Sequence, residues 1–148
     1  MKEATYRSLE SLAPGQQFAI IFWSNEEGGD NVAYPADGGL ATASKAEIEA
    51  ARQHFAEVYA GGRADPRTAI IRAAALRPSA MVLVTGKAFD LDEDLVAATR
   101  DALVGSQTKV HTFALNSDDG TKVLGDISKG TNGQSKVVTR RELRRYSD

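Results

Sequence analysis

The stretch Phe18-Ala19-Ile20-Ile21-Phe22-Trp23 decides the fold class, because it has the character of a strand without a polar face. Its β-branched and aromatic side chains favour an extended conformation. A strand that is apolar on both sides has to be covered on both sides, which is typical of a sheet buried in an α/β protein. A second run of this kind, Ala80-Met81-Val82-Leu83-Val84-Thr85, follows farther along the chain.

Helical patterns alternate with strand patterns over the rest of the sequence. Alternation of this kind predicts a mostly parallel sheet with right-handed crossovers, so we expect a three-layer α/β/α, Rossmann-like fold with helices on both faces. Strands are predicted at 18–23, 80–85, 109–115 and 135–139, with a short edge strand at 32–34; helices are predicted at 1–12, 44–59, 66–77, 90–105 and 121–129, with a short terminal helix at 140–146.

Two of these helices carry recognisable start signals. Ser44 with Glu47 three residues later predicts a capping box, in which each side chain bonds the backbone of the other residue. Asp65 is the predicted N-cap of the next helix, and Pro66 suits its first turn.

Composition narrows the class of protein. A chain of 148 residues suits one domain, so we predict a single domain over 1–148. The net charge of −2 does not favour nucleic-acid binding, and the absence of cysteine excludes disulfides and thiolate chemistry. The apolar runs are too short for a membrane span, and the first residues have no apolar signal segment, so the expected location of the chain as written is the cytoplasm.

The order and local sequence of these elements resemble the von Willebrand factor type A family. The resemblance covers nearly the whole chain, and the succession of the segments carries it, since apolar strands alone occur in every doubly wound fold. The matching segments are Leu9 to Phe22, the helix at 44–59 with Gly61-Gly62 behind it, Arg77 to Thr85, and Val110 to Leu115 with Thr131-Asn132-Gly133.

The resemblance implies a metal ion-dependent adhesion site at the carboxyl ends of the strands, formed by an Asp-x-Ser-x-Ser loop, a Thr and an Asp. The Asp-x-Ser-x-Ser segment would precede residue 1 and is not in the sequence, the Thr position holds Arg63 or Ala64, and Gly86-Lys87 follows Thr85 where the Asp would stand. Hard cations need oxygen ligands, and positive side chains in their place would repel them. We therefore expect a degenerate site without a metal or other cofactor, with Asp65 as its one weak candidate ligand.

The family's first strand, which would lie between the strands near Phe18 and Ala80, is also missing from the sequence. Unpaired backbone groups in a sheet centre cost free energy, so three resolutions are open. The two strands pair directly, another chain donates a strand, or this chain is part of a longer protein. We favour direct pairing or a homodimer.

Other chemical motifs favour structural roles. His54 and His111 lack metal-ligand spacing with a partner, and the acidic cluster from Asp90 to Asp94 is typical of a first helical turn. Thr85-Gly86-Lys87 is not a phosphate loop, because the earlier glycine and the following Ser or Thr are missing.

These observations predict a non-enzymatic protein–protein interaction domain that binds a protein partner through its strand-end loops. Trp23 either caps the core or belongs to this surface. Two alternatives stay open: a small α/β enzyme that uses the strand-end crevice, and a folded fragment with no activity of its own. The expected interaction surface comprises Trp23, Asn25, Arg63, Asp65, Thr85 and Lys87.

Overall fold

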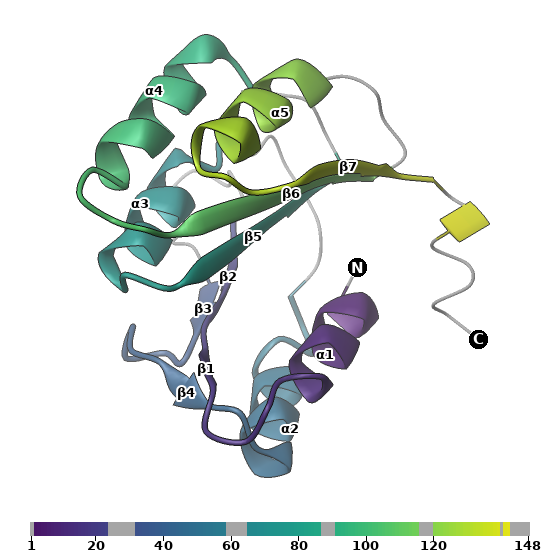
Figure 1. Cartoon of the computed structure of the whole chain (residues 1–148). Helices are drawn as coiled ribbons and strands as arrows, with labels where there is room; N and C mark the ends of the chain where they lie inside the picture. Colours follow the sequence, from purple (N-terminus) through teal and green to yellow (C-terminus); the bar gives the residue numbers. More distant parts are fainter. Residues whose placement is uncertain are drawn as a thin grey trace. The chain divides into compact units, whose positions relative to one another are not determined.

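A computed structural model describes residues 2–23, 32–58, 65–86, 91–115, 120–139 and 141–142 of the chain (Figure 1). The chain divides into two compact units, one over Met1–Gly62 with Ser147 and the other over Arg63–Tyr146 with Asp148. The single domain over 1–148 stays a prediction.

The first unit contains two helices and two small antiparallel ladders. In one ladder Phe18 lies opposite Ala41, and in the other Ile21 lies opposite Ala33. Its elements are α1 (Lys2–Glu10), β1 (Gln17–Phe18), β2 (Ile20–Phe22), β3 (Val32–Tyr34), β4 (Ala41–Thr42) and α2 (Lys45–His54).

The predicted continuous strand at 18–23 is wrong in two respects. The segment is interrupted at Ala19, and its two halves pair with different strands, β1 with β4 and β2 with β3. Both pairings are antiparallel, so the predicted parallel arrangement does not hold in this unit. The physical reason is the neighbouring segment 32–42, which returns along the apolar run and supplies its backbone partners. The predicted short strand at 32–34 is confirmed.

The core of the first unit lies between its strands and its helices. Phe55, fully buried behind the end of α2, meets the ring of Phe22 edge-on at a centroid distance of 4.6 Å. Arg52 joins the two helices, since its guanidinium lies 2.9 Å from a carboxylate oxygen of Glu3 and 3.3 Å from one of Glu10. The buried core residues are Tyr6, Phe18, Ile20, Ala41, Ile48, Ala51 and Phe55.

The start of α2 confirms half of the predicted capping box. The Ser44 Oγ accepts a hydrogen bond from the backbone N–H of Glu47 at 3.1 Å. The Glu47 carboxylate instead accepts a hydrogen bond of 2.5 Å from the Tyr34 hydroxyl, which ties β3 to α2 and raises the pKa of Tyr34 to about 12. The helix ends at His54 rather than near Tyr59, because Ala56 and Val58 bond three residues back in a turn.

The second unit is a three-stranded parallel sheet with three helices. The strand order is β5-β6-β7, with Val82 opposite His111 and Phe113 opposite Lys136. This confirms the predicted strands at 80–85 and 109–115 and their parallel direction. The elements are α3 (Arg67–Ala75), β5 (Ala80–Thr85), α4 (Glu93–Ala102), β6 (Lys109–Leu115), α5 (Thr121–Gly130) and β7 (Ser135–Val138).

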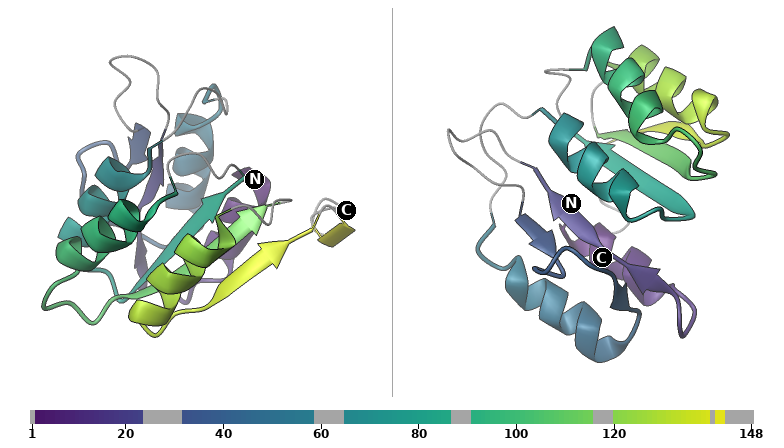
Figure 2. Two further views of the ribbon diagram at one scale, coloured as in Figure 1. Left: turned by 90° about the horizontal axis from the view of Figure 1, so that it is seen from above. Right: turned by 90° about the vertical axis from the view of Figure 1, so that its left-hand side faces the viewer.

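Helices α3, α4 and α5 lie on one side of this sheet (Figures 1 and 2). Alternate side chains face them, and these are buried: Met81 and Leu83 of β5, and Val110, Thr112 and Ala114 of β6. The opposite face is less covered, since Val82 is 62% exposed. None of the described helices is both long and apolar enough to pass through a membrane.

Within the first unit β2 pairs with β3, and within the second unit β5 pairs with β6. Direct pairing of the strands near Phe18 and Ala80, which belong to different units, stays a prediction.

Residues behind α5 approach the backbone of β6 closely. A Cβ atom added at Gly133 would lie 1.9 Å from the carbonyl oxygen of Val110, inside any allowed contact. The N–H of Val110 donates to the Thr131 hydroxyl at 3.0 Å, and the N–H of Thr112 donates to the carbonyl of Gln134 at 2.8 Å. Position 133 therefore requires glycine for close approach of two backbones.

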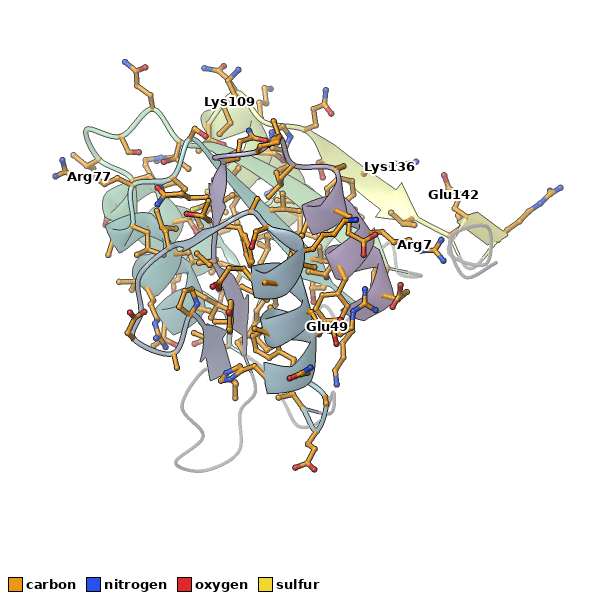
Figure 3. All side chains as sticks on the ribbon, turned by 90° about the horizontal axis from the view of Figure 1, so that it is seen from below. Arg7, Glu49, Arg77, Lys109, Lys136 and Glu142 are labelled. Atoms are coloured by element: carbon orange, nitrogen blue, oxygen red, sulfur yellow. The ribbon has the colours of Figure 1, made fainter. Side chains whose placement is uncertain are left out.

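The last strand leads into a second capping box, which sequence reasoning did not identify. The Glu142 carboxylate accepts the backbone N–H of Thr139 at 2.9 Å, while the Thr139 hydroxyl accepts the N–H of Glu142 at 3.3 Å. Lys136 adds an ion pair of 2.9 Å, with both side chains labelled in Figure 3. The backbone bond and the lysine lower the pKa of Glu142 to about 2. Of the predicted helix at 140–146, only residues 141–142 are described, and they are helical.

We predict opposite effects for alanine at two glycines of the second unit. Gly133→Ala should destabilise the protein by about 1–3 kcal/mol or more, because the Val110 carbonyl has to move. Gly125→Ala, in α5 with nothing within 4 Å of the added Cβ, should stabilise it by about 0.5–1 kcal/mol. Urea unfolding followed by circular dichroism measures both, and equal stability of the two variants would contradict the packing described.

Candidate functional site

A single guanidinium connects the beginnings of α3 and α4. The Nη1 of Arg67 donates to Asp65 Oδ2 at 2.8 Å, and its Nη2 donates to Asp92 Oδ1 at 2.5 Å. The Arg67 side chain is about one quarter exposed, so the bridge is partly shielded from water. Two helix starts separated by strand β5 in the sequence are thereby joined through one cation.

Both carboxylates are also held by backbone N–H groups. Asp65 Oδ1 accepts from the backbone N–H of Arg67 at 2.9 Å, and Asp92 Oδ1 accepts from that of Leu95 at 2.9 Å. Asp92 is the N-cap of α4, and its negative charge suits the positive end of the helix dipole. The predicted N-cap position is wrong by one residue, because α3 begins at Arg67 and its N-cap is Pro66. The Asp65 carboxylate nevertheless accepts the first amide of α3.

The electrostatics follow from these contacts. The backbone N–H of Leu95 and the Arg67 guanidinium lower the pKa of Asp92 below its ordinary value of 3.8. Hydrogen bonds from Arg67 to Asp65 and Asp92 raise the pKa of the guanidinium above its ordinary value. Asp92 and Arg67 therefore stay charged at neutral pH.

These residues do not fit a hard divalent cation. Both oxygens of Asp65 already accept hydrogen bonds from Arg67, and a guanidinium within 2.8 Å would repel a second cation. Within the described ranges no three His, Asp or Glu side chains come together as a ligand set. Asp65, the weak metal candidate from the sequence, is thus part of an ion pair.

The other predicted surface residues are placed only in part. Trp23 is half-buried directly after β2 in the first unit, and Thr85 is half-buried at the end of β5, opposite Ala114. Asn25, Arg63 and Lys87 lie outside the described residues. Of the predicted acidic cluster from Asp90 to Asp94, the structure describes Asp92, Glu93 and Asp94. These three residues form the start of α4, as predicted.

Sequence reasoning missed Arg67, although one signal was available. A cation in the first turn of a helix faces the positive end of the helix dipole, which is unfavourable. An arginine at that position therefore indicates an acidic partner. The sequence spacing alone did not show that this partner would be Asp92, 25 residues farther on.

The parallel sheet with helices connecting its strands defines an α/β protein of the Rossmann-like class. A solved structure, "von Willebrand factor type A from Catenulispora acidiphila", is similar over 93% of this chain with a TM-score of 0.74 and 23% sequence identity. The chain therefore has the von Willebrand factor type A fold, as its resemblance to that family predicted.

The similarity to this solved structure covers only part of the matching chain, so it does not indicate an activity. This chain spans 33% of the length of the matching structure's chain. No protein-family model and no curated protein sequence matches the chain. The likeness establishes the fold.

We predict that the Arg67 bridge contributes stability that depends on pH. Arg67→Met should lower the melting temperature by a few degrees at pH 7, because both ion pairs are lost. Since the pKa of Asp92 is lowered in the folded state, the contribution is present above pH 3.8 and is lost as the pH falls below it.

The difference in melting temperature between the wild type and Arg67→Met should accordingly narrow in acid. Arg100→Met, at an exposed position of α4, serves as the control for loss of a cation. A difference between wild type and Arg67→Met that did not change between pH 7 and acid would contradict the assignment.

Proposed function

We propose that this chain is a non-enzymatic protein-interaction domain of the von Willebrand factor type A fold that works without a divalent cation. The observation that carries the proposal is the Arg67 guanidinium held between Asp65 and Asp92. A cation that is part of the chain joins the starts of α3 and α4, so this junction needs no added ion.

The direction of the pKa shifts supports a non-enzymatic role. A general acid or base works best with a pKa near neutrality. Here the pKa of Tyr34 is raised to about 12 and that of Glu142 is lowered to about 2. The pKa of Asp92 is lowered and that of Arg67 is raised. All four groups move away from pH 7, which is the effect of structural ion pairs and caps.

The cation-independent role predicts a specific pattern of melting temperatures. Mg²⁺ or Ca²⁺ at millimolar concentration should leave the melting temperature of the wild type unchanged, because a ligand stabilises only the state that binds it. Differential scanning fluorimetry with each metal, and with EDTA, measures this. A rise of several degrees with Mg²⁺ would overturn the proposal.

The same proposal requires a protein partner whose capture is insensitive to EDTA. Turnover of a substrate by the purified chain would instead support the small α/β enzyme. A chain that folds but neither binds a partner nor turns over a substrate would be the inactive fragment considered above.

We also infer that a second copy of the chain is a partner. In the second unit β5 pairs only with β6 among the described strands, and its sequence Ala80–Thr85 has no charged residue. Uncharged edge strands readily accept another strand, whereas charges discourage it. The other edge strand, β7, carries Lys136. Two β5 edges related by a twofold axis can therefore pair without a clash of charges.

Light scattering coupled to size-exclusion chromatography should show a dimer at micromolar concentration. Val82→Lys should shift the protein to monomer, because like charges would face each other across the two strands. Ile71→Lys, which places the same charge at an exposed apolar position of α3, should leave the dimer intact. A wild type that is monomeric throughout this range would refute the inference.

A further inference from the structure

The turn between α5 and β7 holds the dipeptide Asn132-Gly133, the one place in the sequence where glycine follows asparagine. An asparagine side chain can lose its amide when the backbone nitrogen of the next residue attacks the side-chain carbonyl carbon. Glycine in that next position favours the reaction, because it has no side chain to hinder the approach. The sequence of this turn therefore has the chemistry of a deamidation site.

The folded turn occupies the nitrogen that would attack. Asn132 is exposed, with a φ of 56° in the left-handed region that asparagine tolerates better than most residues. The N–H of Gly133 donates to the carbonyl of Ser128 at 2.8 Å, and the N–H of Asn132 donates to that of Lys129 at 3.4 Å. These two bonds form a Schellman motif at the end of α5. The Gly133 nitrogen is thus held by the helix end.

The backbone on both sides of the dipeptide is tied to β6. The Thr131 hydroxyl accepts the N–H of Val110 at 3.0 Å, and the carbonyl of Gln134 accepts the N–H of Thr112 at 2.8 Å. Gly133, between these two ties, lies so close to the Val110 carbonyl that a Cβ atom has no room. The folded chain therefore has no slack for a longer backbone at this turn.

The reaction has two steps. The Gly133 nitrogen gives its proton to solvent base and bonds to Cγ of Asn132, ammonia leaves, and a succinimide ring forms. Water then opens the ring at one of its two carbonyl carbons. Attack at the side-chain carbonyl gives aspartate. Attack at the main-chain carbonyl gives isoaspartate, in which the chain runs through Cγ and the backbone gains one carbon atom.

We propose that Asn132-Gly133 is a latent deamidation site, closed by the folded second unit, whose isoaspartate product prevents the unit from regaining its fold. Opening of the turn frees the Gly133 nitrogen from the Ser128 carbonyl. After the reaction, the extra backbone atom does not fit between the ties at Thr131 and Gln134. The site marks irreversibly a chain that has stayed open, whatever the partner of the domain is.

The first measurement compares the rate of deamidation in open and closed states. The full chain is kept at mildly alkaline pH in buffer and in denaturing urea, beside a synthetic peptide of residues 128–136 in both solutions. Mass spectrometry follows the change of the Asn132 amide to a carboxylate. The full chain in buffer should react about tenfold or more slowly than the peptide in buffer, because only its open state reacts. In urea the two rates should agree.

The second measurement follows refolding by circular dichroism after dilution from urea. Wild-type chains should lose the ability to refold in step with their isoaspartate content. Asn132→Gly, which suits the positive φ and has no amide to lose, should refold after the same incubation. Freshly prepared Asn132→Asp has the charge of the product on a backbone of ordinary length, and it should refold as well.

Each part of the proposal can fail separately. Equal rates for the folded chain and the peptide in buffer would show that the turn does not protect Asn132. No reaction in urea would show that the site is not reactive. Refolding of chains that contain isoaspartate at 132, or an equal loss of refolding in Asn132→Gly, would refute the effect of the product. Failure of fresh Asn132→Asp to refold would assign that effect to charge instead of backbone length and would also overturn the proposal.

Discussion

Strand β6 hydrogen-bonds to a parallel strand on each of its two edges. The elements around it in the second unit shield these backbone hydrogen bonds from water. Helix α5 covers it through Thr112, whose hydroxyl donates to the carbonyl of Leu124 at 3.1 Å inside the core. The chain then passes so close to Val110 that only glycine fits at 133.

Positive charge holds each unit together at its helix junctions. In the first unit Arg52 of α2 contacts Glu3 and Glu10 of α1, and its guanidinium also lies 4.6 Å from the centre of the Tyr6 ring. In the second unit Arg67 joins the starts of α3 and α4. Planar guanidinium groups suit this work, since they bind two carboxylates at once and stay charged at any ordinary pH. A guanidinium is part of the chain, so the contact that it makes between two helices is always present. A contact made through a bound metal ion forms only when that ion is available in solution.

The fold could be predicted from the sequence for those strands whose apolar residue pattern follows from burial alone. Segments 80–85 and 109–115 are apolar enough to require cover, and both are the parallel strands expected. The run at 18–23 has the same composition, but its nearest backbone partners lie in the returning segment, which composition does not reveal. Glu47 and Arg67 show a similar limit: their acidic or basic character was evident, but the partners Tyr34 and Asp92 are set by packing between elements.

The open space around two glycines of α5 has a practical consequence. The sequence contains no cysteine, so a thiol introduced at Gly125 or Gly130 would be unique in the chain. Neither position requires neighbouring atoms to move for a first side-chain carbon. Spin labels or fluorophores could thus be attached singly to one helix, five residues apart, to follow motion of that helix in solution without first removing a native reactive group.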